Sequence, residues 1–416
     1  AALWLTNGVV NAHRSGKAAY SGGVTEQGDV LSFRLSSDTP ELNAVVVEGG
    51  TTVLLEPDIA LSGCGCSDFT CKGAAVLAES DAKVDIRNAK LITHGATRAA
   101  TIATSGATLK VFDSELATYG GPLPEGYVPV IGPGMMEPPA PLGLGGNCRT
   151  HLSMDNSESY FYRCRIYGEA WATLSTDSSG GYCYLEANDS SIDMGGNGYC
   201  IYSDNGCHVV LNRCPMSSGN IFGIQDVNSS IQMQDVTGSC KGYGFLIHGG
   251  MHDPEDIGTI RMANTDLTSK GPMFRCKSTN VDIYLKNCRI ISEDGVILES
   301  MLTDDTFYYQ TRSHAEDDYG VQLCMESMEV LGDFHCQDPE RKTCLNLVDT
   351  SITGTITGFP QLRLTEGSSF TATHDSEITL VGSDEGLDAA AGVTITVRGA
   401  GENKFLASGG SLVFLA

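Results

Sequence analysis

Titratable side chains recur at the ends of short apolar segments in the middle of the chain. They are Asp177 in WATLSTD, Asp204 in YCIYSD, Asp226 in FGIQD and His248 in FLIHGG. The steps from 204 to 226 and from 226 to 248 are both 22 residues long. Two carboxylates about 5–10 Å apart can act as acid and base at a glycosidic bond, and an imidazole can share their proton. These four residues are therefore the predicted catalytic set.

Basic and aromatic residues accompany this row, and we expect them to bind substrate. Arg275 and Lys277 lie in FRCK, and Arg149 follows a Pro/Gly-rich stretch. Trp171 and Tyr202 supply ring faces on which a sugar can stack. The alternatives are that the rings pack within the fold, and that each Asp is a turn residue bonded to its own backbone.

A scaffold that repeats is needed to align such residues, and the sequence contains one. Each copy begins with an apolar residue, a residue of any type and a second apolar residue. After one more residue of any type comes a position that is usually Asn or Asp, and then a small residue. The copies are 22–29 residues apart, except for one double interval of 50. The small position falls at Ala89, Ser114, Cys164, Ser190, Cys214, Val236, Thr265 and Cys288.

This period, with apolar residues alternating within each copy, indicates short strands rather than helices. A coil of about 22 residues accommodates three strands and three turns, the rung of a right-handed parallel β-helix. On this pattern the chain resembles the pectate-lyase-like β-helix superfamily over roughly residues 40–400. The resemblance implies the architecture; the fold hosts lyases, hydrolases, epimerases and non-catalytic adhesins.

The order Asp, Asp, His, Arg-any-Lys also weakly resembles polygalacturonase-type glycoside hydrolases. That resemblance implies that Asp204 and Asp226 are the carboxylates, that His248 orients or shares a proton, and that Arg275 and Lys277 hold the sugar. The chain departs from the family pattern twice. Gln-Asp replaces the adjacent Asp pair, and Ile-His-Gly replaces Gly-His-Gly. A one-residue register slip would also turn a predicted side chain inward.

The predicted organisation is one all-β domain. Residues 1–40 are expected to form an N-terminal cap, and residues 41–416 a single right-handed parallel β-helix of roughly 12 coils. The Pro/Gly-rich stretch 121–147 and the polar, aromatic stretch 302–320 are expected to be loop insertions. The first is apolar enough to wall a cleft.

The net charge and the hydropathy of the chain limit the partners and the location that we expect for the protein. The net charge of -25 argues against nucleic-acid partners, and no apolar run is long enough to span a membrane. We expect an extracellular or cell-surface protein whose signal peptide has been removed. It would be a monomer or homotrimer with no cofactor and no recognised metal site, although calcium could bind so acidic a chain.

The 15 cysteines fall into two groups. Cys164, Cys214 and Cys288 share the small position of the repeat, so we expect them to act as small hydrophobes inside the coil. The cluster Cys64, Cys66 and Cys71 predicts disulfides first; metal ligation is the alternative, but its spacing matches no common zinc site.

The resulting hypothesis is a secreted carbohydrate-active enzyme in which hydrolysis is favoured over elimination. Two alternatives remain open: a non-catalytic adhesin or binding β-helix, and a β-helix lyase or isomerase that acts on a small non-sugar molecule. The ligand is accordingly a carbohydrate or a small molecule.

Overall fold

The protein is a parallel β-helix of about 13 coils, as the repeat predicts. The computed structural model describes residues 3–12, 19–24, 30–65, 70–122, 125, 148–177, 181–226, 228–249, 256–304, 319–365 and 367–415, and within these ranges there are strands and turns but no helix. The chain divides into unit 1, Ala1–Gly223, and unit 2, Ile224–Ala416. The predicted insertions 121–147 and 302–320 lie largely outside the described residues.

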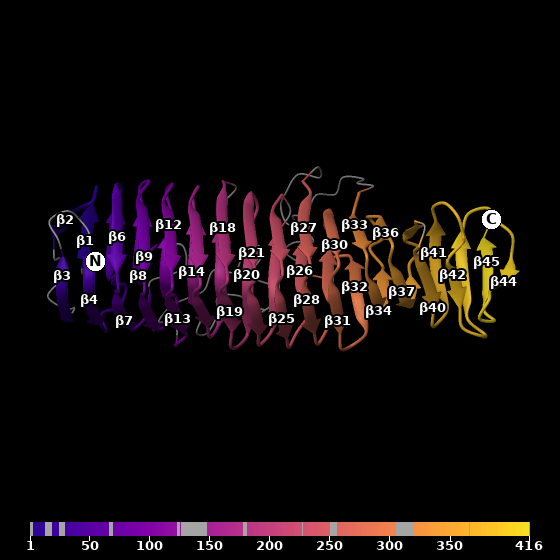
Figure 1. Ribbon diagram of the computed structural model, residues 1–416, viewed down its shortest axis with the longest axis horizontal. Helices are drawn as coiled ribbons and strands as arrows, with labels where there is room; N and C mark the ends of the chain where they lie inside the picture. Colours follow the sequence, from indigo (N-terminus) through magenta and orange to yellow (C-terminus); the bar gives the residue numbers. More distant parts are fainter. Residues whose placement is uncertain are drawn as a thin grey trace. The chain divides into compact units, whose positions relative to one another are not determined.

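In unit 1 each coil contributes one strand to each of three parallel rows, and Figure 1 shows β6, β9, β12 and β18 of the second row side by side in chain order. Row 1 contains β1 (Leu3–Thr6), β5 (Val45–Glu48), β8 (Ala74–Glu79), β11 (Ala99–Ala103), β14 (Cys148–Met154), β17 (Trp171–Asp177) and β20 (Gly198–Ser203). Row 2 contains β6 (Thr51–Leu55), β9 (Lys83–Arg87), β12 (Thr108–Phe112), β15 (Glu158–Tyr162), β18 (Cys183–Asn188) and β21 (Cys207–Asn212). Row 3 contains β7 (Asp58–Ser62), β10 (Lys90–His94), β13 (Glu115–Tyr119), β16 (Arg165–Gly168), β19 (Ser191–Met194) and β22 (Pro215–Ser218).

The start of the chain joins these rows. β1 pairs in parallel with β5, so row 1 begins within the stretch expected to be a cap. Two antiparallel pairings occur there: β1 with β2 (Val9–Ala12), and β3 (Ala19–Val24) with β4 (Val30–Ser37). β4 also pairs in parallel with β7, which ties this hairpin to the third row.

Unit 2 repeats the three-row plan, and β23 (Ile221–Asp226) carries the boundary between the units. Row 1 of this unit contains β26 (Phe245–His248), β29 (Phe274–Lys277), β32 (Val296–Met301), β35 (Asp333–Cys336) and β38 (Ile356–Thr357). Row 2 contains β24 (Ser230–Gln234), β27 (Gly258–Ala263), β30 (Val281–Lys286), β33 (Val321–Glu326), β36 (Thr343–Val348), β39 (Gln361–Leu364), β41 (Ser376–Leu380), β43 (Thr394–Arg398) and β45 (Ser411–Leu415), with β44 (Lys404–Phe405) antiparallel to β45. Row 3 contains β25 (Thr237–Cys240), β28 (Asp266–Ser269), β31 (Arg289–Ser292), β34 (Glu329–Leu331), β37 (Ser351–Gly354), β40 (Ser369–Ala372) and β42 (Leu387–Ala389).

The Asn/Asp position of the repeat is the turn between rows 2 and 3. Asn88, Asp113 and Asp189 there have φ of 52°, 52° and 51°. Their left-handed conformation explains the preference, because Asn and Asp adopt it more readily than other residues with a side chain. Arg163 occupies the same turn with φ 54° and binds the Asp113 carboxylate with its Nε atom at 2.6 Å.

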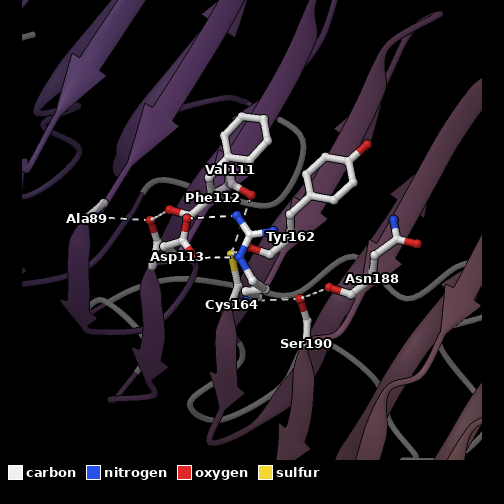
Figure 2. Close-up of polar contacts among 10 residues, drawn as sticks. Ala89, Val111, Phe112, Asp113, Tyr162, Cys164, Asn188 and Ser190 are labelled. Carbon is white, nitrogen blue, oxygen red and sulfur yellow. Dashed lines mark hydrogen bonds and ion pairs between the residues drawn. The ribbon is translucent and has the colours of Figure 1, made fainter.

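The small position that follows points into the coil and links successive turns (Figure 2). The Ser114 hydroxyl accepts a hydrogen bond from the Ala89 amide at 2.9 Å and donates to the Phe112 carbonyl at 2.6 Å. Cys164 takes this place one coil on: it is buried, and its Sγ lies 3.4 Å from the Tyr162 carbonyl. The prediction that such cysteines act as small interior residues is confirmed.

The N-terminal cysteine cluster differs from the expectation. Cys64 and Cys71 are free thiols, and Cys66 lies outside the described residues. The fully buried Arg98 ties this region together instead. Its guanidinium donates to the carbonyls of Thr39, Leu42, Ser62, Gly63 and Gly73 at 2.6–3.1 Å.

Candidate functional site

The predicted residues of unit 2 lie at the carboxyl ends of neighbouring row 1 strands. Asp226 is the last residue of β23, His248 of β26 and Lys277 of β29. His248 and Lys277 are register partners. Phe245 and Phe274, three residues earlier, stack inside the coil with ring centroids 5.7 Å apart. By the two-residue alternation of a strand, His248 and Lys277 project from the opposite, outward side.

This row, Asp226–His248–Lys277, is buried although it projects outward. His248 Nδ1 lies 3.5 Å from Asp226 Oδ1, and these side chains are 2% and 8% exposed. Lys277 is 6% exposed, and its Nζ contacts Oδ1 of Asp304, which is 68% exposed, at 2.7 Å. The predicted neighbourhood of Asp226 and His248 is therefore present, but it is shielded from solvent rather than lining an open groove.

Lys277 also stabilises the charged form of the Asp304 carboxyl. Its hydrogen bond is the main cause that lowers the pKa of the Asp304 carboxyl, and its positive charge adds to the effect. The row thus begins with a buried carboxyl beside an imidazole and ends with an exposed carboxylate held by an ammonium group. Asp304 was not among the predicted residues, because it belongs to the chain after β32 and only the fold brings it to Lys277.

Arg275 lies in the same strand as Lys277 and two residues before it. Its Nε binds Glu299 Oε2 at 2.6 Å, and the two residues are register partners on β29 and β32. The guanidinium carbon also stands 4.5 Å from the centre of the Tyr243 ring. Arg275 is therefore held by a carboxylate and a ring face, which fixes its direction beside the row.

The predicted carboxylates Asp177 and Asp204 belong to unit 1. Asp177 ends β17, whereas Asp204 follows β20 and receives a hydrogen bond from the Tyr202 hydroxyl at 3.3 Å. The Asp204 amide donates to the Thr176 hydroxyl at 3.1 Å, so its turn is fixed to the preceding coil. The predicted pairing of Asp204 with Asp226 joins residues of different units and remains a prediction.

Arg149 and Trp171 contact each other in unit 1. The Arg149 guanidinium carbon lies 4.9 Å from the Trp171 ring centre, and the two residues are 7% and 6% exposed. Most of the indole surface is therefore already covered by protein. Their assignment as substrate-binding residues stays a prediction.

A second surface, the tyrosine surface of row 2, gathers aromatic and acidic side chains in unit 1. Tyr160 and Tyr184 are neighbours on β15 and β18, with ring centroids 5.5 Å apart. Their hydroxyls donate to Glu158 at 3.0 Å and Glu186 at 2.6 Å. Tyr182, 40% exposed, extends the surface. Burial and then these carboxylates raise the pKa of both Tyr160 and Tyr184, so their hydroxyls stay protonated donors.

Two features are absent from the described part of the chain. No group of three or more His, Cys, Asp or Glu side chains in those ranges is arranged to hold a metal ion. No helix of the described residues is long and apolar enough to cross a membrane. The chain matches no protein-family model, and a comparison with curated proteins finds no similar sequence.

Proposed function

We propose that this protein is an extracellular carbohydrate-active β-helix that breaks a glycosidic bond at the row Asp226–His248–Lys277. The observation that carries the proposal is the contact of the Asp226 carboxyl with the His248 imidazole at 3.5 Å, with Lys277 in register on the next strand. Proton transfer at a glycosidic oxygen needs a carboxyl of this kind. The resemblance to pectate-lyase-like proteins supports a carbohydrate substrate.

The proposed mechanism gives different catalytic roles to the carboxyls of Asp226 and Asp304. Asp226 is buried and shares its surroundings with His248, whereas Asp304 is exposed and Lys277 lowers the pKa of its carboxyl. A carboxyl whose charged form is stabilised in this way suits the role that stays charged. Asp226 and His248 are shielded in the free protein, so the proposed reaction requires the substrate to displace the side chains that cover them. Asp226, with His248, then delivers the proton to the leaving oxygen, while Asp304 supports the attacking water.

The test is activity on a panel of plant and microbial polysaccharides, followed by released reducing ends. General acid–base catalysis contributes about 10²–10⁴-fold, so Asp226→Asn and His248→Gln should each lose activity on that scale. Asp266→Asn is the matched control, because Asp266 is a carboxylate in the same unit that pairs with Arg289 on the surface. Reducing ends without an unsaturated, ultraviolet-absorbing product indicate hydrolysis; the appearance of that product indicates elimination.

Equal activity of Asp226→Asn and the Asp266→Asn control on a substrate that the native protein cleaves would reject the proposed site. Wild-type inactivity on the whole panel, combined with retained binding, would favour the second candidate.

The second candidate function is non-catalytic binding of a glycan, and the tyrosine surface of row 2 favours it. Tyr160 and Tyr184 present adjacent rings with carboxylates bonded to their hydroxyls, a mixture of stacking surface and hydrogen-bond acceptors that sugars use. Affinity electrophoresis in polysaccharide gels tests it. Tyr160→Ala and Tyr184→Ala should abolish retardation, whereas Asp226→Asn should leave it unchanged.

A further inference from the structure

Two cysteines of unit 1 face each other across neighbouring strands. Cys183 begins β18, Cys207 begins β21, and the two are register partners in a parallel ladder. Both are fully buried. Neighbouring strands lie about 4.8 Å apart, and a disulfide bond needs Cα atoms about 4.4–6.8 Å apart. Both side chains leave the same side of the sheet, and the spacing of neighbouring strands falls within the Cα range of a disulfide.

The two thiols also interact. Cys207 is the main cause that lowers the pKa of the Cys183 thiol, and Cys183 is the main cause that raises the pKa of the Cys207 thiol. Of the pair, Cys183 is therefore the thiol that ionises first, and a thiolate is the nucleophile of thiol–disulfide exchange.

Other cysteines in the described strands lack this arrangement. Cys276 is in register with Ser300, and Cys344 with Gln322. In the ladder of small residues, Ser190 lies between Cys164 and Cys214. The juxtaposition of Cys183 with Cys207 is therefore a property of this pair rather than of buried cysteines in general.

We propose that Cys183 and Cys207 are a cross-linking site, which a small-molecule disulfide oxidant converts to a disulfide bond between adjacent coils. The Cys183 thiolate attacks one sulfur of the oxidant, forms a mixed disulfide and releases one thiolate. The Cys207 thiolate then attacks the Cys183 sulfur, forms the intramolecular bond and releases the second thiolate. The protein thiols give up two protons and two electrons, and the oxidant leaves as two thiols.

The cross-link would hold the turn that carries Asp204. The Cys207 amide donates to the Asp204 carbonyl at 2.8 Å, and the Ser203 hydroxyl donates to the Cys207 carbonyl at 3.1 Å. A bond from Cys207 to Cys183 would therefore connect this turn to the preceding coil. Because both sulfurs are buried in the folded protein, the finished bond is shielded from reductants.

The experiment is refolding of the full chain in a buffer of oxidised and reduced glutathione, followed by alkylation of remaining thiols in denaturant and peptide mass mapping. Trypsin leaves Cys183, Cys200 and Cys207 on the single peptide 166–213, since that stretch contains no internal Lys or Arg. A second cleavage after Glu186 and Asp204 separates the three cysteines. The expected product is a peptide pair joining 183 to 207, lighter than its two thiol forms by two hydrogen atoms.

Variants make the result specific. Cys200→Ser should keep the link, whereas Cys183→Ser should leave Cys207 fully alkylated, with far-UV circular dichroism to confirm that each variant folds. Alkylation of both Cys183 and Cys207 in refolded wild-type protein would overturn the proposal, as would a dominant link from either one to Cys200.

Discussion

The His151→Gln substitution should reduce the loss in free energy of unfolding that the protein undergoes as the pH falls from 7 to 5. His151 is fully buried, with Nδ1 2.8 Å from the Thr101 hydroxyl and Nε2 2.8 Å from the Ser153 hydroxyl. Its ring also packs edge-on against Phe161 at 4.9 Å. Burial lowers the pKa of His151 from 6.5 to about 3, so the folded protein keeps the ring neutral.

The sign and size of the effect follow from proton linkage. Between pH 6.5 and about 3 the unfolded chain binds a proton at His151 that the folded chain does not. Stability from this residue is therefore present above the unfolded pKa and falls as the pH drops. From pH 7 to pH 5 the loss is about 2 kcal/mol, since each pH unit below the unfolded pKa costs about 1.4 kcal/mol.

Urea unfolding of wild-type protein and His151→Gln at pH 7 and pH 5 measures this difference. Glutamine does not titrate, so the variant should lose about 2 kcal/mol less than the wild type between the two pH values. Phe274→Leu is the control: Phe274 is fully buried but does not titrate, so its replacement should leave the wild-type pH dependence in place. Equal pH dependence in wild type and His151→Gln would refute the reasoning.

Three further changes test the packing of the fold by urea unfolding. Arg98→Met leaves five carbonyls without their donor and should destabilise the protein by about 4 kcal/mol; Arg98→Lys should recover part of this. Asn287, at φ 50°, should tolerate glycine, whereas Asn287→Val should be less stable by about 1–2 kcal/mol. Phe274→Ala removes a fully buried ring and should cost about 3–5 kcal/mol.

Much of the fold could be predicted because each coil imposes the same local demands. The turn between rows 2 and 3 requires a left-handed residue, which selects Asn or Asp at positions such as Asn88. The next position points inward beside its counterpart one coil away, which selects small residues such as Ser114. These demands repeat with the coil, so they are visible as a period. The predicted number of roughly 12 coils agrees with the observed number of about 13.

The region around Arg98 could not be predicted in this way. Its carbonyl partners lie 25–59 residues away in sequence, and neither a period nor a motif marks them. The sequence instead predicted disulfides among the nearby cysteines, of which Cys64 and Cys71 are free thiols. A buried guanidinium can bind several carbonyls at once. Arg98 therefore cross-links the region in which the cysteine spacing predicted disulfides.

In the candidate site, too, the features that repeat with the coil could be predicted from the sequence, and the features that do not repeat could not. The 22-residue step between Asp226 and His248 is one coil, so the sequence could predict that they meet, and the 3.5 Å contact confirms it. The contact of Lys277 with Asp304 depends on a segment outside the repeat, for which the period gives no information. The repeat therefore supplies a row of aligned side chains, and a non-repeating segment adds Asp304 to it. Alignment in the row does not distinguish a catalytic role of Asp226 from a structural one. The activity of Asp226→Asn, compared with that of Asp266→Asn, decides between the two roles.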